Sequence, residues 1–335
     1  MHRREFLQAS AGAALLASLP QCARDEDRWD AAAYVKPPSS RVAILRADRY
    51  DAPLRDILLA GLELFRLDVR GRKILLKPNF VEFDPGGVIN THPALLAAAI
   101  EAFRTLGARE VVVGEGPGHR RDNQHLLSAS GIDDVLRDSG TPYVDLNYAR
   151  VRRVRLRSRF SGLEELYLPE VVLDADLFVS MPKMKTHHWA GITLSLKNMF
   201  GIVPGSVYGW PKNLLHWAGI RGSILDINAS LAMPRFNIVD GIMGMEGNGP
   251  IQGEPRQSGV LVLGADPVAV DATCARLMSI DPWKIGYLEE AGAFLGNVAD
   301  EKVEQIGEEL ERFRQDYRVI ENFQRTKITP RMTAG

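Results

Sequence analysis

The stretch LFVSMPKMKTH, residues 177–187, contains the pattern on which the fold prediction depends. A short apolar run typical of a buried strand is followed at once by polar and basic residues. The same change from apolar to polar or glycine-rich residues occurs after 74–76, 111–113, 238–239 and 261–263. Amphipathic stretches typical of helices alternate with these runs. The alternation predicts an α/β fold with a mostly parallel open sheet flanked by helices.

An antiparallel ribbon is expected to be inserted near residues 150–168. Residues 151–159 alternate apolar and basic residues, and the acidic pair Glu164 and Glu165 lies in the second half of the insert. We favour one solvated face of a ribbon, because like charges crowd an exposed strand without needing any partner. A basic groove for polyanions is the alternative.

Four segments are predicted along the chain. Residues 41–295 form the α/β domain, as one body or as two lobes that divide near 150–175. Residues 296–335 are charged and only weakly periodic, which predicts a C-terminal helix and a tail. The remaining segments are an export signal, 1–23, and a tether, 24–40.

The composition is that of an ordinary globular chain and excludes several classes of protein. The 335 residues are 45% hydrophobic and 25% charged, which suits one large or two modest domains. With 41 basic and 42 acidic residues the net charge is −1, which argues against nucleic acid as a main partner. No run of about 18 apolar residues occurs, so no transmembrane span is predicted. Two cysteines, Cys22 and Cys274, are too few for a four-cysteine iron–sulfur or zinc site.

The N-terminus resembles a twin-arginine export signal. Arg3 and Arg4 are followed by an acidic residue, by Phe-Leu and by an apolar stretch. This predicts an exported protein, periplasmic or associated with the cell envelope; an amphipathic N-terminal helix is the alternative. The sequence LPQC, 19–22, departs from a lipoprotein motif at its bulky Gln. A lipid anchor at Cys22 and a soluble exported form therefore both stay open.

The candidate ligand site lies where the predicted strands end. The carboxyl ends of parallel strands line the ligand crevice of an open α/β sheet, so we expect the loops to meet there. Lysines at these ends suit a small phosphate or carboxylate ligand, and a glycine-rich loop presents backbone N–H groups to an anion. The expected ligand-binding residues are Lys77, Asn79, Gly114, Gly116, Gly118, Lys183, Lys185, Lys197, Asn198, Asp266 and Asp271. For Asp266, which precedes Pro267, a helix N-cap is the alternative.

Histidines and carboxylates accompany the lysines and are the candidates for proton transfer. The expected catalytic residues are His187, His216, Asp240 and Glu246. Glycines are frequent in residues 240–250, which we interpret as a mobile loop that covers the ligand.

A divalent metal is the second interpretation of the histidines, because imidazole and carboxylate groups bind transition metals. The candidate metal ligands are His92, His187 and His216. No closely spaced metal-binding motif supports this set. Each histidine has a hydrogen-bonding or capping role as its alternative, and His92, directly before Pro93, is a candidate helix cap.

Several of these motifs together resemble the family known as domain of unknown function 362. The matching stretches are KPN (77–79), THP (91–93), 111–118, MPKMKTH (181–187), TLSLKNMFG (193–201), 240–250 and GADPVAVD (264–271). The resemblance implies little about activity. Some relatives carry a ferredoxin-like segment with cysteine-ligated clusters, which implies redox work and a redox partner; this chain lacks those cysteines. Twin-arginine signals also occur on members.

The sequence therefore predicts an exported enzyme that acts on a small anionic ligand in a crevice of lysines, histidines and acids. Redox and metal-dependent chemistry both stay open, with a divalent metal as the one candidate cofactor. A non-catalytic anion- or metal-binding protein of the cell envelope is the alternative.

Overall fold

The computed structural model describes residues 28–118 and 122–328. The predicted export signal and Cys22 lie outside the described residues, as does the start of the tether. The strands are β1 (Ser40–Arg46), β2 (Lys73–Pro78), β3 (Glu110–Glu115), β4 (Tyr143–Asp145), β5 (Val151–Arg155), β6 (Glu165–Pro169), β7 (Leu177–Met181), β8 (Lys183–His187), β9 (Gly191–Thr193), β10 (Arg235–Asn248), β11 (Gln252–Gly264) and β12 (Val303–Gly307).

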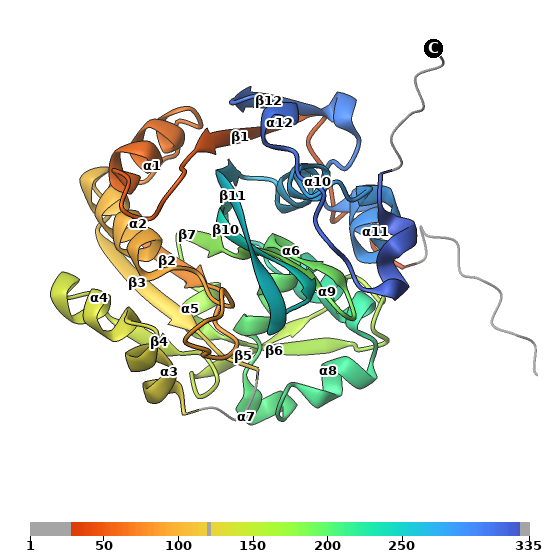
Figure 1. Cartoon of the computed structure of the whole chain (residues 1–335). Helices are drawn as coiled ribbons and strands as arrows, with labels where there is room; N and C mark the ends of the chain where they lie inside the picture. The colour runs from red at the N-terminus through yellow and green to blue at the C-terminus, as the bar shows by residue number, and fades with distance from the viewer. Residues whose placement is uncertain (1–27, 119–121, 329–335) are drawn as a thin grey trace, which may run out of the picture.

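Within the described part, ten of these strands form one sheet in the order β12-β1-β11-β10-β7-β2-β3-β4, with β8 on β10 and β9 on β8 (Figure 1). Strands β10, β7, β2, β3 and β4 are parallel neighbours, and β12 is parallel to β1. Strand β11 runs antiparallel to both β1 and β10. The predicted α/β fold with a mostly parallel sheet is confirmed. Because β7 pairs with β2, one sheet continues across residues 150–175.

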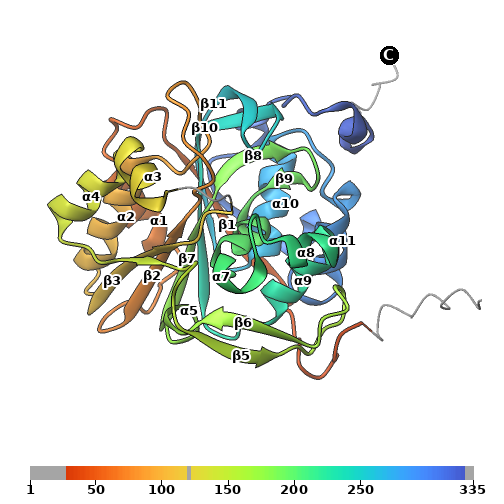
Figure 2. The ribbon, with the colours of Figure 1, turned by 90° about the horizontal axis from the view of Figure 1, so that it is seen from below.

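Helices cover both faces of the sheet (Figure 2). On one face lie α1 (Leu54–Glu63), α2 (Pro93–Thr105), α3 (Asn123–Ala129) and α4 (Ile132–Ser139). On the other lie α6 (Ser195–Asn198), α7 (Gly205–Tyr208), α8 (Asn213–Trp217), α9 (Ile220–Ala229), α10 (Pro267–Leu277) and α11 (Gly286–Phe294). A short helix, α5 (Glu170–Leu173), follows β6. None of the helices in the described ranges is long and apolar enough to span a bilayer.

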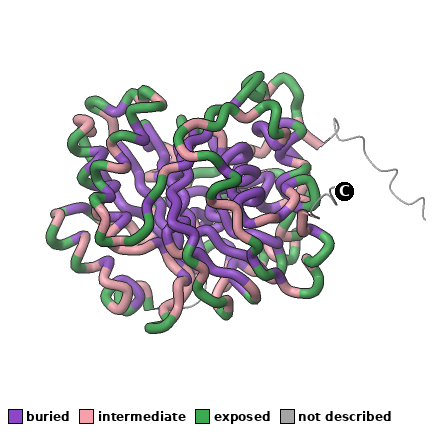
Figure 3. Tube along the Cα trace, turned by 45° about the horizontal axis from the view of Figure 1, so that its top comes forward, coloured by how far each residue is buried: buried purple, intermediate pink, exposed green. Residues whose placement is uncertain are grey.

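The two faces of the sheet bury separate apolar clusters, as the buried inner chain in Figure 3 indicates. In β2, Ile74 and Leu76 belong to the cluster beneath α1 and α2, and Leu75 belongs to the cluster beneath α10. Successive strand residues point to opposite faces, so a strand with helices on both sides must be apolar throughout. This requirement explains the uninterrupted apolar runs of the sequence.

The predicted antiparallel ribbon is confirmed as β5 and β6, which form a separate two-stranded sheet. Three of the arginines in this region, Arg150, Arg152 and Arg153, are paired with acids at the surface. Arg153 lies 3.5 Å from Glu165, and Arg150 lies 3.6 Å from Glu170. These exposed ion pairs favour the solvated face over the basic groove.

Most of the glycine-rich segment 240–250 is strand rather than the covering loop expected from the sequence, and residues 249–251 form the turn between β10 and β11. The strand part continues β10, which pairs with β11 from Asn237 opposite Gly264 to Asn248 opposite Gln252. The glycines of the segment permit close packing rather than motion: a Cβ atom at Gly249 would overlap the carbonyl of Thr186.

The C-terminal segment also differs from its predicted helix. Residues 303–307 form β12, which extends the sheet beside β1. The helix that follows, α12 (Leu310–Phe313), is a single turn. The partly buried residues of β12, Val303 and Ile306, are three positions apart, so the segment lacks the two-residue period that indicates a strand.

Candidate functional site

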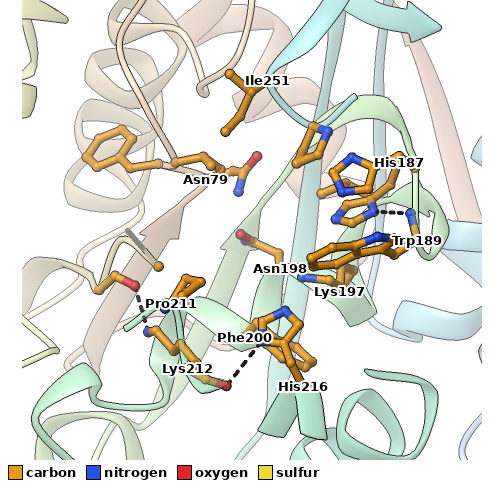
Figure 4. Close-up of a pocket in the computed structure, with 18 of the residues that line it drawn as sticks. Asn79, His187, Trp189, Lys197, Asn198, Phe200, Pro211, Lys212, His216 and Ile251 are labelled. Atoms are coloured by element: carbon orange, nitrogen blue, oxygen red, sulfur yellow. Dashed lines mark hydrogen bonds between the residues drawn. The ribbon is translucent and has the colours of Figure 1, made fainter. Parts of the chain in front are cut away.

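A pocket of about 400 Å³ lies at the carboxyl ends of the parallel strands (Figure 4). Seven residues expected from the sequence line it, namely Asn79, Gly116, Gly118, His187, Lys197, Asn198 and His216. The strand order explains their convergence. Asn79 follows β2, Gly116 and Gly118 follow the adjacent β3, and His187 ends β8, which continues from β7. Parallel neighbours end at one edge of a sheet, so their loops meet.

An ion pair supports the pocket floor. Lys77 and Glu115 are 0% and 1% exposed, and Nζ of Lys77 lies 2.6 Å from Oε2 of Glu115. The same ammonium donates to the carbonyl of Pro78 and to Oδ1 of Asn198, each at 3.0 Å. These three bonds use all three N–H groups of the lysine. Lys77 therefore positions Asn198 rather than binding ligand itself, which corrects the sequence expectation.

Glycine is required directly above this ion pair. A Cβ atom at Gly201 would overlap Oε1 of Glu115 and Nζ of Lys77. The chain can therefore pass over the buried charges only where no side chain is present. Gly201 also lines the pocket, so it separates the buried pair from the ligand space.

Lys197 differs from the buried lysines around it. In the described part of the chain, its Nζ has no hydrogen bond or ion pair and lies 4.1 Å from the ring centre of Phe200. A cation over an aromatic face is stabilised, but its hydrogen-bonding capacity stays unused. Burial, followed by repulsion from Lys77, lowers the pKa of Lys197 to about 8.

Two further polar atoms of the pocket lack partners. Oδ1 of Asn79 and Oγ1 of Thr193 are buried without a hydrogen bond among the described residues. Their side chains are 6% and 4% exposed. A buried polar atom without a partner costs about 1–3 kcal/mol, so such atoms require an explanation. A polar ligand seated in the pocket would supply the missing hydrogen bonds.

The hydrogen bonds of His187 define its tautomer. Its Nδ1 accepts from the backbone N–H groups of Trp189 (3.0 Å) and Ala190 (3.2 Å), so the proton of the neutral ring is on Nε2. Burial, and then the charge of Lys197, lower the pKa of His187. The neutral ring of His187 therefore presents an N–H group at Nε2 and has no free lone pair with which to accept a proton.

His216 has the opposite tautomer. Its Nδ1 lies 3.1 Å from the carbonyl oxygen of Lys212, an atom that can only accept. In the neutral ring the lone pair is therefore on Nε2. His216 packs against Phe200, with ring centres 5.4 Å apart, so this imidazole and Lys197 share one aromatic neighbour. Of the four residues expected to transfer protons, His216 alone has a suitable tautomer within the pocket.

Lys212 was not identified from the sequence. It is 2% exposed and lines the pocket, and its ammonium donates to the carbonyls of Gly116 (2.8 Å) and Val203. Its φ of +71° is strained for a lysine, and the two hydrogen bonds indicate why it is held there. Burial lowers its pKa to about 7. No strand end precedes Lys212, so the pattern that identified the other residues could not include it. Thr193, the last residue of β9, and Phe200 were also not identified from the sequence.

The expected catalytic residue Asp240 does not line the pocket. It lies within β10, where Oδ2 is 2.6 Å from Nζ of Lys183 and accepts from the backbone N–H of His92 at 3.0 Å. Its Oδ1 accepts from the hydroxyl of Tyr50 at 2.9 Å. The ammonium of Lys183 also donates a hydrogen bond to the hydroxyl of Tyr50, so Lys183 belongs to this buried cluster. Both residues connect elements of the fold, because β10 continues past the end of β7 and pairs there with β8, with Asp240 opposite Lys183.

His92 is a helix cap rather than a metal ligand. Its Nδ1 accepts from the N–H of Ala94 at the start of α2, and its ring stacks on Tyr50 with centres 3.6 Å apart. It does not line the pocket that contains His187 and His216, so the three expected metal ligands are not assembled. Across residues 28–118 and 122–328, no group of three His, Cys, Asp or Glu side chains is arranged to hold a metal ion.

Lys185 and Glu246 also form hydrogen bonds that join separate segments of the fold. The ammonium of Lys185 is fully buried and donates to the carbonyl of Ile89 at 2.7 Å. Burial lowers the pKa of Lys185 far below its usual value. The carboxylate of Glu246 accepts from the backbone and side chain of Arg318, which fastens the C-terminal segment to β10.

The remaining expected residues lie away from the pocket. Because β11 is antiparallel to β10, its carboxyl end is at the opposite edge of the sheet, where Asp266 caps α10. Asp271 accepts from the backbone N–H groups of Ser195 and Leu196 at the start of α6. It thereby supports the turn that carries Lys197, and burial raises its pKa to about 7. Gly114 lies within β3, packed between Leu75 and Leu146.

The model of the domain of unknown function DUF362 matches residues 74–276, a range that includes every pocket-lining segment. The chain belongs to this family. A thylakoid-associated protein of Synechocystis sp. is 30% identical to this member over 256 residues, which cover 72% of the present chain and 75% of the relative.

Two solved structures resemble this DUF362 protein more distantly. A protein from Thermotoga maritima has 16% identity and a TM-score of 0.42, with 66% of the present chain covered. The lactate racemase apoprotein from Thermoanaerobacterium thermosaccharolyticum has 13% identity and a TM-score of 0.40, with 76% covered. The chain spans 58% of the length of each of these structures.

Proposed function

We propose that the pocket binds a small organic anion on Lys197 and that the protein is an enzyme in which His216 accepts and returns a proton. The observation that carries the proposal is the ammonium of Lys197, which faces the pocket without a carboxylate partner in the described part of the chain. Neighbouring buried lysines have carboxylate or carbonyl partners, so among the lysines of the described residues Lys197 is the one whose charge a ligand would neutralise.

The remaining walls favour an organic anion over a bare inorganic one. Phe80, Trp189, Phe200 and Ile251 give the pocket an apolar lining around its few polar groups. Ligand sites typically combine such walls with a small number of orienting polar groups. The Nε2–H of His187 and the unpaired oxygens of Asn79 and Thr193 supply those groups. A binding protein without turnover, the alternative, would use the same contacts without proton transfer at His216.

Substitution K197A is expected to weaken the binding of benzoate, a small carboxylate with an apolar body, about tenfold to hundredfold. A hydrogen bond to a charged group contributes about 1.5–3 kcal/mol, which corresponds to that range. Isothermal titration calorimetry measures the affinity. The matched control is K284A, which removes a half-exposed lysine outside the pocket. Equal affinities of the two variants would contradict the proposal.

The affinity for benzoate is also expected to fall as the pH rises through about 8. The pKa of Lys197 is lowered to that value, so the ammonium that attracts the anion loses its proton there. Benzoate itself stays ionised throughout. In K197R the guanidinium keeps its charge, so the decrease should disappear. A wild-type affinity that is constant between pH 7 and 9 would count against Lys197 as the anion-binding group.

We also propose that the protein is exported by the twin-arginine route. The support is the Arg3-Arg4 motif and the apolar stretch that follows it; the name of the relative from Synechocystis describes that protein as thylakoid-associated. Changing Arg3 and Arg4 to Lys is expected to leave uncleaved precursor in the cytoplasm, detected by fractionation and immunoblotting. Undiminished export of the double variant would refute the assignment.

A further inference from the structure

We propose that Lys197 is a nucleophile that forms an imine with an aldehyde or ketone group of the bound anion. This inference rests on the proposed function for the position of the ligand, and it adds the ligand's chemical class, a carbonyl acid. Its basis is the location of one amine with unused hydrogen-bonding capacity in a pocket that also holds an imidazole with the tautomer of a base.

The surroundings of Lys197 suit a nucleophilic amine. Its nitrogen lies over the face of Phe200 and has no carboxylate beside it in the described chain, so no ion pair has to break before it reacts. The lowered pKa, about 8, leaves about a tenth of the amine neutral at pH 7. A lysine that is partly desolvated and near another cation is a recognised form of activated nucleophile.

Lys212 is the competing amine, and its geometry is less suitable. Its pKa is also lowered, to about 7, but its nitrogen is directed at the carbonyls of Gly116 and Val203. Reaction at Lys212 would require both hydrogen bonds to break and would release the loop after β3. The geometry therefore favours Lys197 as the reacting group.

The reaction needs no oxidant or reductant. His216 Nε2 first takes a proton from the ammonium of Lys197. The amine lone pair then attacks the carbonyl carbon, so that a C–N bond forms and the C=O π bond becomes an alkoxide. A proton passes from the attacking nitrogen, now positively charged, to this alkoxide and gives the neutral carbinolamine. His216 returns its proton to the departing hydroxyl. Loss of water leaves a protonated imine, whose positive charge remains beside the ligand carboxylate. Amine and carbonyl are thus converted into imine and water.

His187 and Asn79 would orient the ligand during these steps. The Nε2–H of His187 can donate to the carboxylate, and because its Nδ1 is held by two backbone N–H groups, this ring does not exchange the proton. The unpaired Oδ1 of Asn79 can accept from the hydroxyl of the carbinolamine. Figure 4 shows these side chains facing the same space from separate segments of the chain.

Reductive trapping tests the proposal. The full chain is incubated with phenylpyruvate and sodium cyanoborohydride, which reduces an imine to a stable amine, and the modified peptide is identified by mass spectrometry. We expect a single adduct on Lys197, formed faster at pH 8 than at pH 6.5 and suppressed by excess benzoate. H216Q is expected to slow trapping about a hundredfold, the typical contribution of acid–base catalysis.

The outcomes separate this inference from the proposed function. If wild-type protein binds benzoate but phenylpyruvate labels Lys197 no faster than the exposed lysines, the imine is refuted and the anion site stands. An adduct on Lys212 also refutes the assignment. If K197A binds benzoate as K284A does, the proposed function itself fails. K197R, which keeps the charge but cannot form the imine, should bind benzoate more tightly than K197A and give no adduct at residue 197.

Discussion

Substitution of Lys77 by Met is expected to lower the free energy of unfolding by about 3–5 kcal/mol. Removal of one partner from a buried ion pair leaves the other charge uncompensated, which produces losses of this size. Glu115 would retain only the backbone N–H groups of Phe80 and Gly116 as hydrogen-bond donors. Urea unfolding followed by tryptophan fluorescence measures the change.

Lys73 provides a matched control on the same two strands. It pairs with Glu110 at 3.7 Å near the surface, with side-chain exposures of 26% and 43%. K73M is expected to cost less than about 1 kcal/mol, as exposed ion pairs do. The double variant K77M/E115Q should recover part of the loss, because no buried charge remains. Similar losses for K77M and K73M would show that the buried pair does not stabilise the fold as argued.

The variant D240A is expected to be destabilised by a comparable amount, about 3–5 kcal/mol. It would leave the buried ammonium of Lys183 without its carboxylate and the N–H of His92 without an acceptor. D240N, which keeps an acceptor oxygen, should be less affected. D48A is the control, because the Asp48–Arg46 pair is half-exposed at both ends.

The same variants test whether Asp240 belongs to the fold or to the site. Asp240 connects β8, β10, the start of α2 and Tyr50, and it does not line the pocket. Folded D240N is therefore expected to bind benzoate with the wild-type affinity, measured by calorimetry under native conditions. If D240N loses as much affinity for benzoate as K197A does, Asp240 belongs to the ligand site, as the sequence alone suggested.

The local pattern of the chain was sufficient for the fold class. Strands buried on both faces must be apolar throughout, so 74–76, 111–113 and 177–179 were recognisable without knowledge of their neighbours. The ribbon near 150–168 was recognisable for a similar reason, since its alternation has the period of a half-exposed strand. The segment 240–250 was not recognisable as a strand, because its glycines suggested a loop; Gly244, packed against Tyr317, lies within β10, and Gly249, packed against Thr186, lies in the turn that follows.

The candidate site was only partly accessible from the sequence. Lys77, Lys183, Lys185 and Lys197 all follow or precede strand ends and look equivalent in the chain. Lys77, Lys183 and Lys185 donate hydrogen bonds to other parts of the fold. Their acceptors, Glu115, Asp240 and Ile89, lie far from them in the sequence. Lys212, which no strand end precedes, reaches the pocket only because the chain around α7 and α8 folds over the end of β3.

By itself the sequence determined that this chain alternates strands and helices and that Asn79, Gly116, His187 and Lys197 lie near strand ends. Tertiary structure decided which strand ends meet. The antiparallel direction of β11 moves Asp266 to the far edge, and the extension of β10 removes Asp240 from the rim. Strand order and direction arise from contacts between distant residues, and those contacts also decide which of the buried charges in the described chain have partners within the fold.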